Sequence, residues 1–260
     1  MGLILVACEG VIGGAGGGPR RGDDGPSNSS GSTFGYASQA SLLRLTKLQH
    51  RRTMEDLLGH FLGGDADAVL DTIEPAYGII PDDPSELDVG GLVGSTFSRM
   101  SQNVGELHVR GYFDVARLAA NAITQDDLRR SRMFNGCGDV ASDNHSSCIE
   151  PFIESFGLWA MRRPLTEDER NFFLHTVFAN DGQSYEATPQ ALADLLVSFL
   201  ISPNFIYRIE TGGEEIDEGL YELDAYGLAA RLSYHFWGSM PDDELFAAAA
   251  DGSLMTEAGY

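Results

Sequence analysis

The chain has 260 residues, enough to bury a substantial core, and its hydrophobic content of 43% is ordinary for a globular protein of one or two domains. It carries 39 acidic against 17 basic side chains, a formal net charge of -22. Because this charge repels phosphate backbones, we expect no nucleic-acid partner. An acidic surface that keeps the protein soluble is the simpler interpretation; the alternative is attraction of cations, basic proteins or a positively charged redox partner.

The amino terminus resembles a bacterial lipoprotein signal. A short apolar run ends in Leu5-Val6-Ala7-Cys8, which matches a lipobox, although the run is shorter than usual and no basic segment precedes it. We therefore expect segment 1–8 to be a signal remnant whose Cys8 is lipidated, which would anchor the protein to the bacterial cell envelope, periplasmic or surface exposed. The alternative is an ordinary apolar start with an incidental cysteine.

Residues 9–40 are rich in Gly, Ser and Pro and contain almost nothing to bury. This composition is typical of a flexible, disordered tether. A tether between a lipid-bearing cysteine and a folded body would let that body clear the membrane surface, so the two features support each other.

Two further cysteines, Cys137 and Cys148, flank a polar loop. Export makes a disulfide between them our expectation. Two free thiols are one alternative, and metal ligation with His145 between them is another, but the spacing Cys-x7-His-x2-Cys fits no zinc pattern.

The first half of the body is predicted to be helical. Thr46 and Gln49 form a capping box that begins a helix over 46–58, with Gly59 at its end. A second amphipathic segment lies near 65–72, and apolar spacing predicts two more helices within 90–122.

The second half repeats these signals. Phe152, Phe156 and Trp159 recur at helical spacing before Pro164, and a second capping box at Thr166 predicts a helix over 166–178. The final helices are marked in the same way. A helix is predicted to begin at Thr188-Pro189 and to run to Leu200, and a strand is predicted over Phe205–Ile209. The next predicted helix is capped by Asp224, has Leu228, Leu232 and Phe236 on one face, and ends at Gly238. A last helix is predicted to begin at Pro241-Asp242.

The fold class expected from these signals is mainly α, a multi-helix, bundle-like body with at most a short β segment near Phe205–Ile209, behind the disordered tether. We expect a first helical domain at 41–134, a middle one carrying the cysteine loop at 135–182, and the start of a third at 183–260.

Several segments together resemble the helical domains of unknown function found in surface or periplasmic proteins of planctomycetes and myxobacteria, often beside c-type cytochrome domains. Leu45 to Gly59 is similar to the opening motif of that family, with His50 and Arg52 where Tyr and Asn are usual. The middle and third domains of the family are matched by three later runs: Arg162-Arg163-Pro164-Leu165-Thr166, Ser202-Pro203-Asn204-Phe205-Ile206-Tyr207-Arg208, and Leu228 to Asp242.

The resemblance implies no established reaction. It implies that similar proteins continue past the equivalent of Leu254, so we expect a fragment with an exposed apolar patch around Tyr226, Phe236, Trp237 and Leu245.

Three functions are compatible with these residues: an interaction module, a hydrolase, and the calcium binding taken up in the next paragraph. We favour a noncatalytic, envelope-located interaction module that works with a cytochrome or another envelope protein in electron transfer or polysaccharide handling. The alternative is a carboxylate-dependent hydrolase with weak candidates His235, Asp242 and Asp243; His235 is more often packed, and acidic residues in a first helical turn are ordinary.

The remaining candidates concern bound ions. Arg162 and Arg163 are either anion-binding or structural, and the structural role is the more frequent one. Calcium binding would use Asp65, Asp67 and Asp71, or Asp82 and Asp83, but neither group has EF-hand spacing. No cofactor is expected, and no motif identifies an enzyme.

Overall fold

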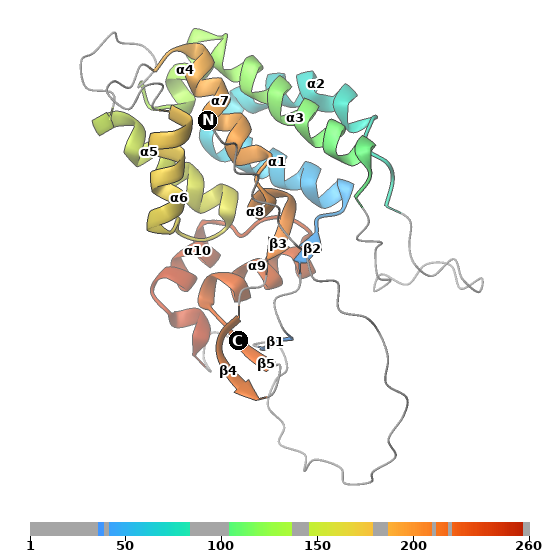
Figure 1. Ribbon diagram of the computed structural model, residues 1–260, viewed down its shortest axis with the longest axis vertical. Helices are drawn as coiled ribbons and strands as arrows, with labels where there is room; N and C mark the ends of the chain where they lie inside the picture. The colour runs from blue at the N-terminus through green and yellow to red at the C-terminus, as the bar shows by residue number, and fades with distance from the viewer. Residues whose placement is uncertain are drawn as a thin grey trace, which may run out of the picture. The chain divides into compact units, whose positions relative to one another are not determined.

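The computed structural model describes residues 36–38, 42–83, 104–136, 146–178, 187–209, 212–217 and 220–256. These residues are mainly helical, as predicted (Figure 1). The helices longer than one turn are α1 (Lys47–Leu62), α2 (Ala66–Tyr77), α3 (Glu106–Thr124), α4 (Asp127–Met133), α5 (Ser146–Met161), α6 (Glu167–Asn171), α7 (Pro189–Leu200), α9 (Ala225–Phe236) and α10 (Asp243–Ala250). Shorter or irregular helical segments are η2 (Gly63–Asp65), η4 (Phe172–Phe178), α8 (Pro203–Ile206) and η5 (Ser253–Met255).

Helix α1 begins where the sequence predicts and ends later. The Thr46 side chain accepts a hydrogen bond from the Gln49 amide at 3.0 Å, and the Gln49 side chain accepts one from the Thr46 amide at 3.0 Å. Gly59 lies inside the helix, so the predicted end there is wrong. The helix ends instead before Gly63, whose φ of +55° is a conformation that few other residues adopt. A glycine marks a helix end only when its backbone leaves the helical region.

The predicted capping signals of the second half are confirmed. Thr166 and Glu169 form the second capping box, and the Thr188 hydroxyl accepts a hydrogen bond from the Ala191 amide at 3.1 Å. The helix predicted over 166–178 is α-helical only as far as Asn171 and becomes a π-helix from Phe172 to Phe178 (η4). Wide π-helical turns are rare and are often found at functional sites.

The β structure is more extensive than expected. Strand β3 (Tyr207–Ile209) lies in the predicted segment and pairs antiparallel with β2 (Leu42–Arg44). A separate antiparallel sheet has the order β1-β5-β4. The prediction of at most one β segment is therefore too low, because each short strand is stabilised by a partner, and for β1 and β2 that partner is far away in sequence. The three strands of that second sheet are β1 (Tyr36–Ser38), β4 (Gly212–Asp217) and β5 (Leu220–Leu223).

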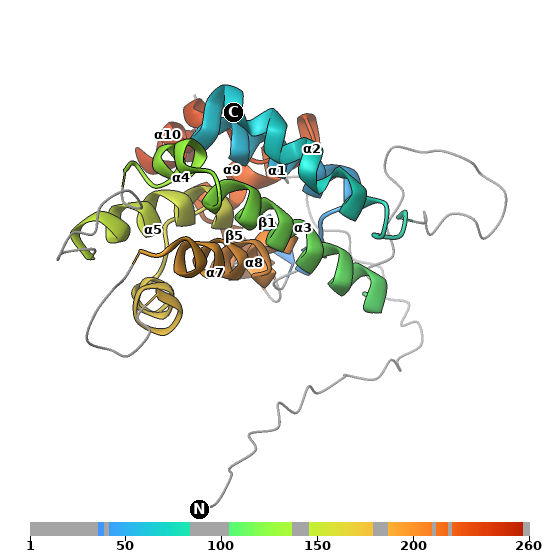
Figure 2. The same ribbon diagram turned by 90° about the horizontal axis from the view of Figure 1, so that it is seen from above.

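One large hydrophobic core unites most of the helices. Helix α3 packs against both α2 and α7, and seen from above these helices lie in adjoining layers (Figure 2). Met54, Phe156 and Phe199 belong to this core, so each of the three predicted segments contributes to it. A smaller cluster forms around α9, α10 and η5. Its buried members are Leu223, Leu228, Ala229, Ala249 and Leu254.

The corner between α9 and α10 follows the predicted capping pattern. Asp224 Oδ1 accepts from the Gly227 amide at 2.6 Å, Gly238 has φ +69°, and Asp242 Oδ1 accepts from the Leu245 amide at 2.9 Å. Leu228 is buried, but Phe236 is 68% exposed and Trp237 is 42% exposed. Phe236, the last residue of α9, is therefore exposed although it lies on the same helical face as Leu228. Of the expected apolar patch, Phe236 and Trp237 are exposed, whereas Tyr226 and Leu245 are partly buried against the hydrophobic clusters.

Candidate functional site

A buried arginine joins the end of α5 to three other elements. Arg162 follows α5 with φ +59°, and its side chain is nearly inaccessible. Its guanidinium donates to three main-chain carbonyls at and beyond α8, those of Asn204, Phe205 (3.3 Å) and Tyr207 (2.8 Å). Carbonyls at a helix C-terminus carry partial negative charge and lack partners within the helix. The arginine thus satisfies acceptors that would otherwise be left unpaired.

The same guanidinium extends to α9 and α1. It donates to the Tyr234 hydroxyl at 3.2 Å, and that hydroxyl lies 2.8 Å from Thr53 Oγ1. Thr53 in turn donates to the Gln49 carbonyl at 2.8 Å. We call Arg162, Tyr234 and Thr53 with the three carbonyls the Arg162 cluster; it connects α5, α8, α9 and α1.

Arg163, next in sequence, has a different role. Its two terminal nitrogens bind the two carboxylate oxygens of Glu169 at 2.8 and 2.7 Å, and this pairing holds the pKa of Glu169 at about 2. The Asn204 amide donates to Glu169 Oε1 at 3.2 Å, and the Thr166 amide donates to Glu169 Oε2 at 2.9 Å. All acceptor positions of this carboxylate are therefore occupied by the protein itself.

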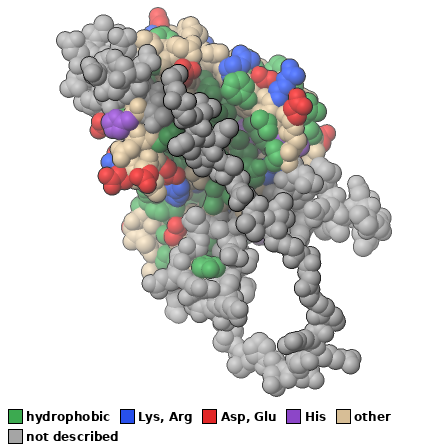
Figure 3. Space-filling model, in the orientation of Figure 1, with side chains coloured by type: hydrophobic (Ala, Val, Ile, Leu, Met, Phe, Trp, Pro, Cys, Tyr) green, Lys and Arg blue, Asp and Glu red, His purple; other side chains and the backbone are tan. Residues whose placement is uncertain are grey.

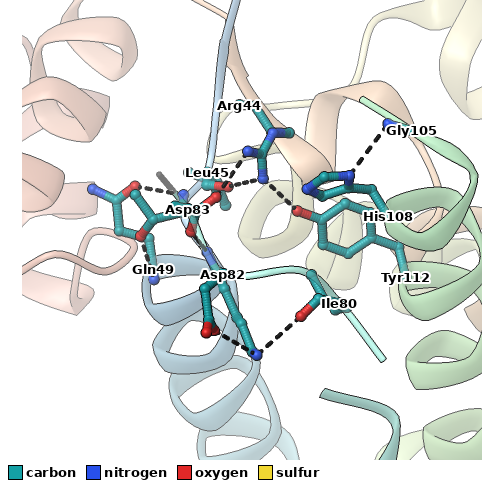
Figure 4. A network of polar contacts seen from close by, with 11 residues as sticks. Arg44, Leu45, Gln49, Ile80, Asp82, Asp83, Gly105, His108 and Tyr112 are labelled. Atoms are coloured by element: carbon teal, nitrogen blue, oxygen red, sulfur yellow. Dashed lines mark hydrogen bonds and ion pairs between the residues drawn. The ribbon is translucent and has the colours of Figure 1, made fainter. Parts of the chain in front are cut away.

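A second polar network lies at the start of α1 (Figure 4). Arg44 donates to Asp83 at 2.8 Å and to the Tyr112 hydroxyl at 3.1 Å, and the Lys47 amide donates to the other Asp83 oxygen at 2.6 Å. The Lys47 ammonium donates to the Ile80 carbonyl at 3.0 Å. We call these residues the Arg44 network. It fixes the segment after α2 between α1 and α3.

His50 lies between the two polar centres. Its ring is 4.8 Å from the ring of Tyr112, which binds Arg44, and 5.5 Å from that of Phe205, whose carbonyl binds Arg162. His50 Nδ1 is 2.9 Å from the Tyr77 hydroxyl, and within the described residues Nε2 has no hydrogen-bond partner. Burial lowers the pKa of His50 to about 3, and the positive charge of Arg162 acts in the same direction. The imidazole is therefore neutral at physiological pH.

An open groove of about 510 Å³ lies beside the Arg163–Glu169 pair. Helix α6 with η4 forms one side, and the end of α7 with α8 forms the other. Helix α7 and η4 contact each other, and α6 and α7 are labelled in Figure 1. Met161 and Phe173 are buried at its floor, whereas Phe172 and Ile201 on its walls are 50% and 39% exposed. Apolar hollows with a few polar groups are the usual form of ligand-binding sites. The polar lining consists of Asp168, Glu169, Ser198, Ser202 and Asn204.

The structure brings together only some of the predicted site residues. Arg162 and Arg163 lie side by side but point to different partners, and both of their described roles are structural. Asp242 caps α10, Asp243 is exposed in its first turn, and His235 is exposed with its ring against Phe236. His235 thus packs against its neighbour Phe236 in the last turn of α9, although its side chain is exposed.

The cysteine predictions fall outside what the structure describes. Cys8, Cys137 and His145 are outside the described residues, as is the side chain of Cys148 and most of the tether. The lipid anchor and the disulfide stay predictions.

The aspartates weighed for calcium have other partners. Asp83 pairs with Arg44, Asp82 with Lys47, and Asp65 with Arg132. Asp67 and Asp71 are exposed on α2. Over the described ranges, no group of three or more His, Cys, Asp or Glu side chains is arranged to hold a metal ion.

Comparison with known proteins follows the same segments. Residues 148–210 match the family described as "Protein of unknown function (DUF1595)", and residues 223–260 match the one described as "Protein of unknown function (DUF1592)". These two matches fit the resemblance to helical domains of unknown function that the sequence motifs show. No curated protein and no solved structure matches.

Both the Arg162–Arg163 run and the groove lie within the DUF1595 match, whereas the α9–α10 corner lies within the DUF1592 match. Among the described helices, none is both long and apolar enough to cross a membrane.

The groove was not predicted from the sequence. Its residues come from two motifs that the sequence does show, the Thr166 capping box and the Ser202-Pro203-Asn204 run, which the tertiary packing brings together and the Asn204–Glu169 hydrogen bond joins. The one local signal was the pair Phe172-Phe173 within the predicted helix, of which Phe172 is exposed and Phe173 is buried.

Proposed function

We propose that the protein is an exported, lipid-anchored interaction module without catalytic activity of its own, and that the groove between α6–η4 and α7–α8 is its binding surface. The partner would be another envelope protein, in an electron-transfer or polysaccharide-handling system. The observation that carries this proposal is the groove itself. It exposes Phe172 and Ile201 on the walls of a 510 Å³ apolar hollow that the described residues leave open.

Contiguous exposed apolar surfaces often mark interaction sites, whereas single exposed apolar side chains are normal. Figure 3 shows that hydrophobic side chains do reach the surface of the viewed face among charged ones, and the groove differs from such scattered exposure in being concave. Its two sides are also joined, because Asn204 and Arg163 both donate hydrogen bonds to Glu169. A preformed wall loses little conformational freedom on binding, which favours recognition of a partner.

The groove is tested by placing a photo-crosslinking amino acid at Ile201 in the full chain in its native envelope. We expect one reproducible crosslinked protein from this position. The matched control is the same amino acid at Asp71, an exposed residue of α2. Equal crosslinking from both positions, or none from Ile201, would contradict the groove as a binding surface.

The lipid anchor is tested separately with Cys8→Ser. We expect the wild-type protein in the membrane fraction, labelled by a fatty-acid analogue, and the variant unlabelled and released. A variant that keeps its label and its membrane association would exclude lipidation at Cys8.

A further inference from the structure

The charge of the groove indicates what kind of partner it fits. Among the described residues that line it, Asp168 and Glu169 are the only ionisable ones, so this part of the lining contains no basic side chain. The negative charge of Glu169 is balanced by the positive charge of Arg163, which holds the pKa of Glu169 at about 2. Asp168 is exposed, and its carboxylate has no ion pair within the described part of the chain. One negative charge is therefore available at the rim.

The end of α7 adds to this negative potential. Ser198, Ile201 and Ser202 line the groove from the last turn of this twelve-residue helix and just beyond it. The C-terminal end of a helix carries partial negative charge from its unpaired carbonyl groups, and that charge favours a cation. The positive end of α6 does not oppose it, because Glu167, Asp168 and Glu169 already occupy its first turn.

The floor of the groove requires something apolar. Met161 and Phe173 are 6% and 3% exposed, and the walls are Phe172, Ile201 and Pro203. A methionine and two phenylalanines form an adaptable surface for aliphatic or aromatic side chains. The net charge of -22 would attract a basic partner from a distance.

We infer that the groove binds a polypeptide segment of the partner in which an apolar side chain stands next to lysine or arginine. The apolar side chain lies on Met161 and Phe173, and the basic group lies between Asp168 and the end of α7. This inference rests on the proposed function and adds the chemistry of the partner to it.

The test uses the full chain and two synthetic twelve-residue peptides. Both carry leucines spaced three and four residues apart; one has lysines at the intervening positions and the other has glutamates. We expect the lysine peptide to bind at least about tenfold more tightly at low ionic strength, and expect this preference to shrink as salt is added. Equal binding of the two peptides would overturn the inference.

Variants locate the effect. Asp168→Lys should weaken binding of the lysine peptide by about tenfold, because it converts the unpaired charge at the rim from negative to positive. Asp71→Lys makes the same change on α2 and should alter the affinity less than about twofold. Ile201→Ser should weaken binding of the lysine peptide, because it removes an apolar contact. Equal effects of Asp168→Lys and Asp71→Lys would show that only net charge matters and would overturn the site.

The two proposals can fail separately. If neither peptide binds but the photo-crosslinker at Ile201 still captures one protein, the inferred chemistry is wrong and the interaction surface stands. If lysine-peptide binding is unchanged in Asp168→Lys and Ile201→Ser, the peptide binds elsewhere and the inference is overturned.

Discussion

Arg44 and Arg162 are both buried guanidinium groups in the same helical body, and they are neutralised in different ways. Arg44 pairs with a carboxylate, that of Asp83, and with the Tyr112 hydroxyl. The described contacts of Arg162 are with three main-chain carbonyls and the Tyr234 hydroxyl. The Arg44 network joins two opposite charges, whereas the Arg162 cluster satisfies a short helix end and the strand after it. Arg44 and Asp83 can both be replaced by apolar side chains, which removes the donor and the acceptor together. No such paired replacement exists for Arg162, because its carbonyl acceptors belong to the backbone.

The largest expected effect is that of Arg162→Met. It leaves the carbonyls of Asn204, Phe205 and Tyr207 without their donor in a buried place, so we expect the free energy of unfolding to fall by about 3–5 kcal/mol. Urea denaturation measures it. Arg163→Met is the matched control and should cost only about 1 kcal/mol, because the Arg163–Glu169 pair is partly exposed. Similar losses for both variants would contradict the role assigned to Arg162.

In the Arg44 network, a second substitution should restore part of the stability lost by the first. Arg44→Met leaves the Asp83 carboxylate, whose side chain is 13% exposed, without its ion pair, and we expect a loss of about 2–4 kcal/mol. Adding Asp83→Leu removes the uncompensated charge, so the double variant should be more stable than Arg44→Met alone. A denaturant-based double-mutant cycle measures this coupling. A double variant less stable than either single one would indicate that the two residues act independently.

His50 links the two centres and should make stability depend on pH. The pKa of the folded state is about 3 against about 6.5 for the unfolded chain, so the unfolded state takes up a proton first as pH falls. Stability from the neutral ring is complete above about pH 6.5 and is lost between pH 6.5 and 3, by about 2 kcal/mol at pH 5.

Comparing wild type with His50→Phe isolates this residue from the other groups that titrate in the same range. The difference in unfolding free energy between the two proteins should change by about 2 kcal/mol between pH 7 and 5. A difference that stays constant over that interval would mean that His50 is not buried as a neutral ring.

The smallest effects concern two helical glycines. A Cβ on Gly157 would lie 2.5 Å from the Leu165 side chain, so Gly157→Ala should displace Leu165 and lower the free energy of unfolding by about 1–3 kcal/mol. Nothing lies within 4 Å of the Cβ position at Gly59, where Gly59→Ala should stabilise α1 by about 0.5–1 kcal/mol. Thermal unfolding distinguishes them. Shifts of the same sign would show that the packing of Leu165 on α5 is looser than the structure indicates.

Local signals predicted the helix starts well. Thr46, Thr166, Thr188, Asp224 and Asp242 each accept a hydrogen bond from an amide of the first turn, as their positions before apolar periodic segments indicate. A cap needs only residues within one turn, so sequence suffices. Helix ends were less predictable, since Gly59 and Gly63 are the same residue type and differ only in backbone conformation.

The sequence by itself determined the helical class, the caps and the motifs that lie in the two matched domains, because all of these depend on short-range spacing. Only the tertiary structure decided that Arg162 would bind carbonyls about 42 to 45 residues away and that Arg163, its neighbour, would turn to Glu169. The pairing of β2 with β3 and the meeting of η4 with α7 were decided in the same way. Contacts of this kind depend on the packing of whole helices around one core, and no local pattern records which partner a long side chain will reach.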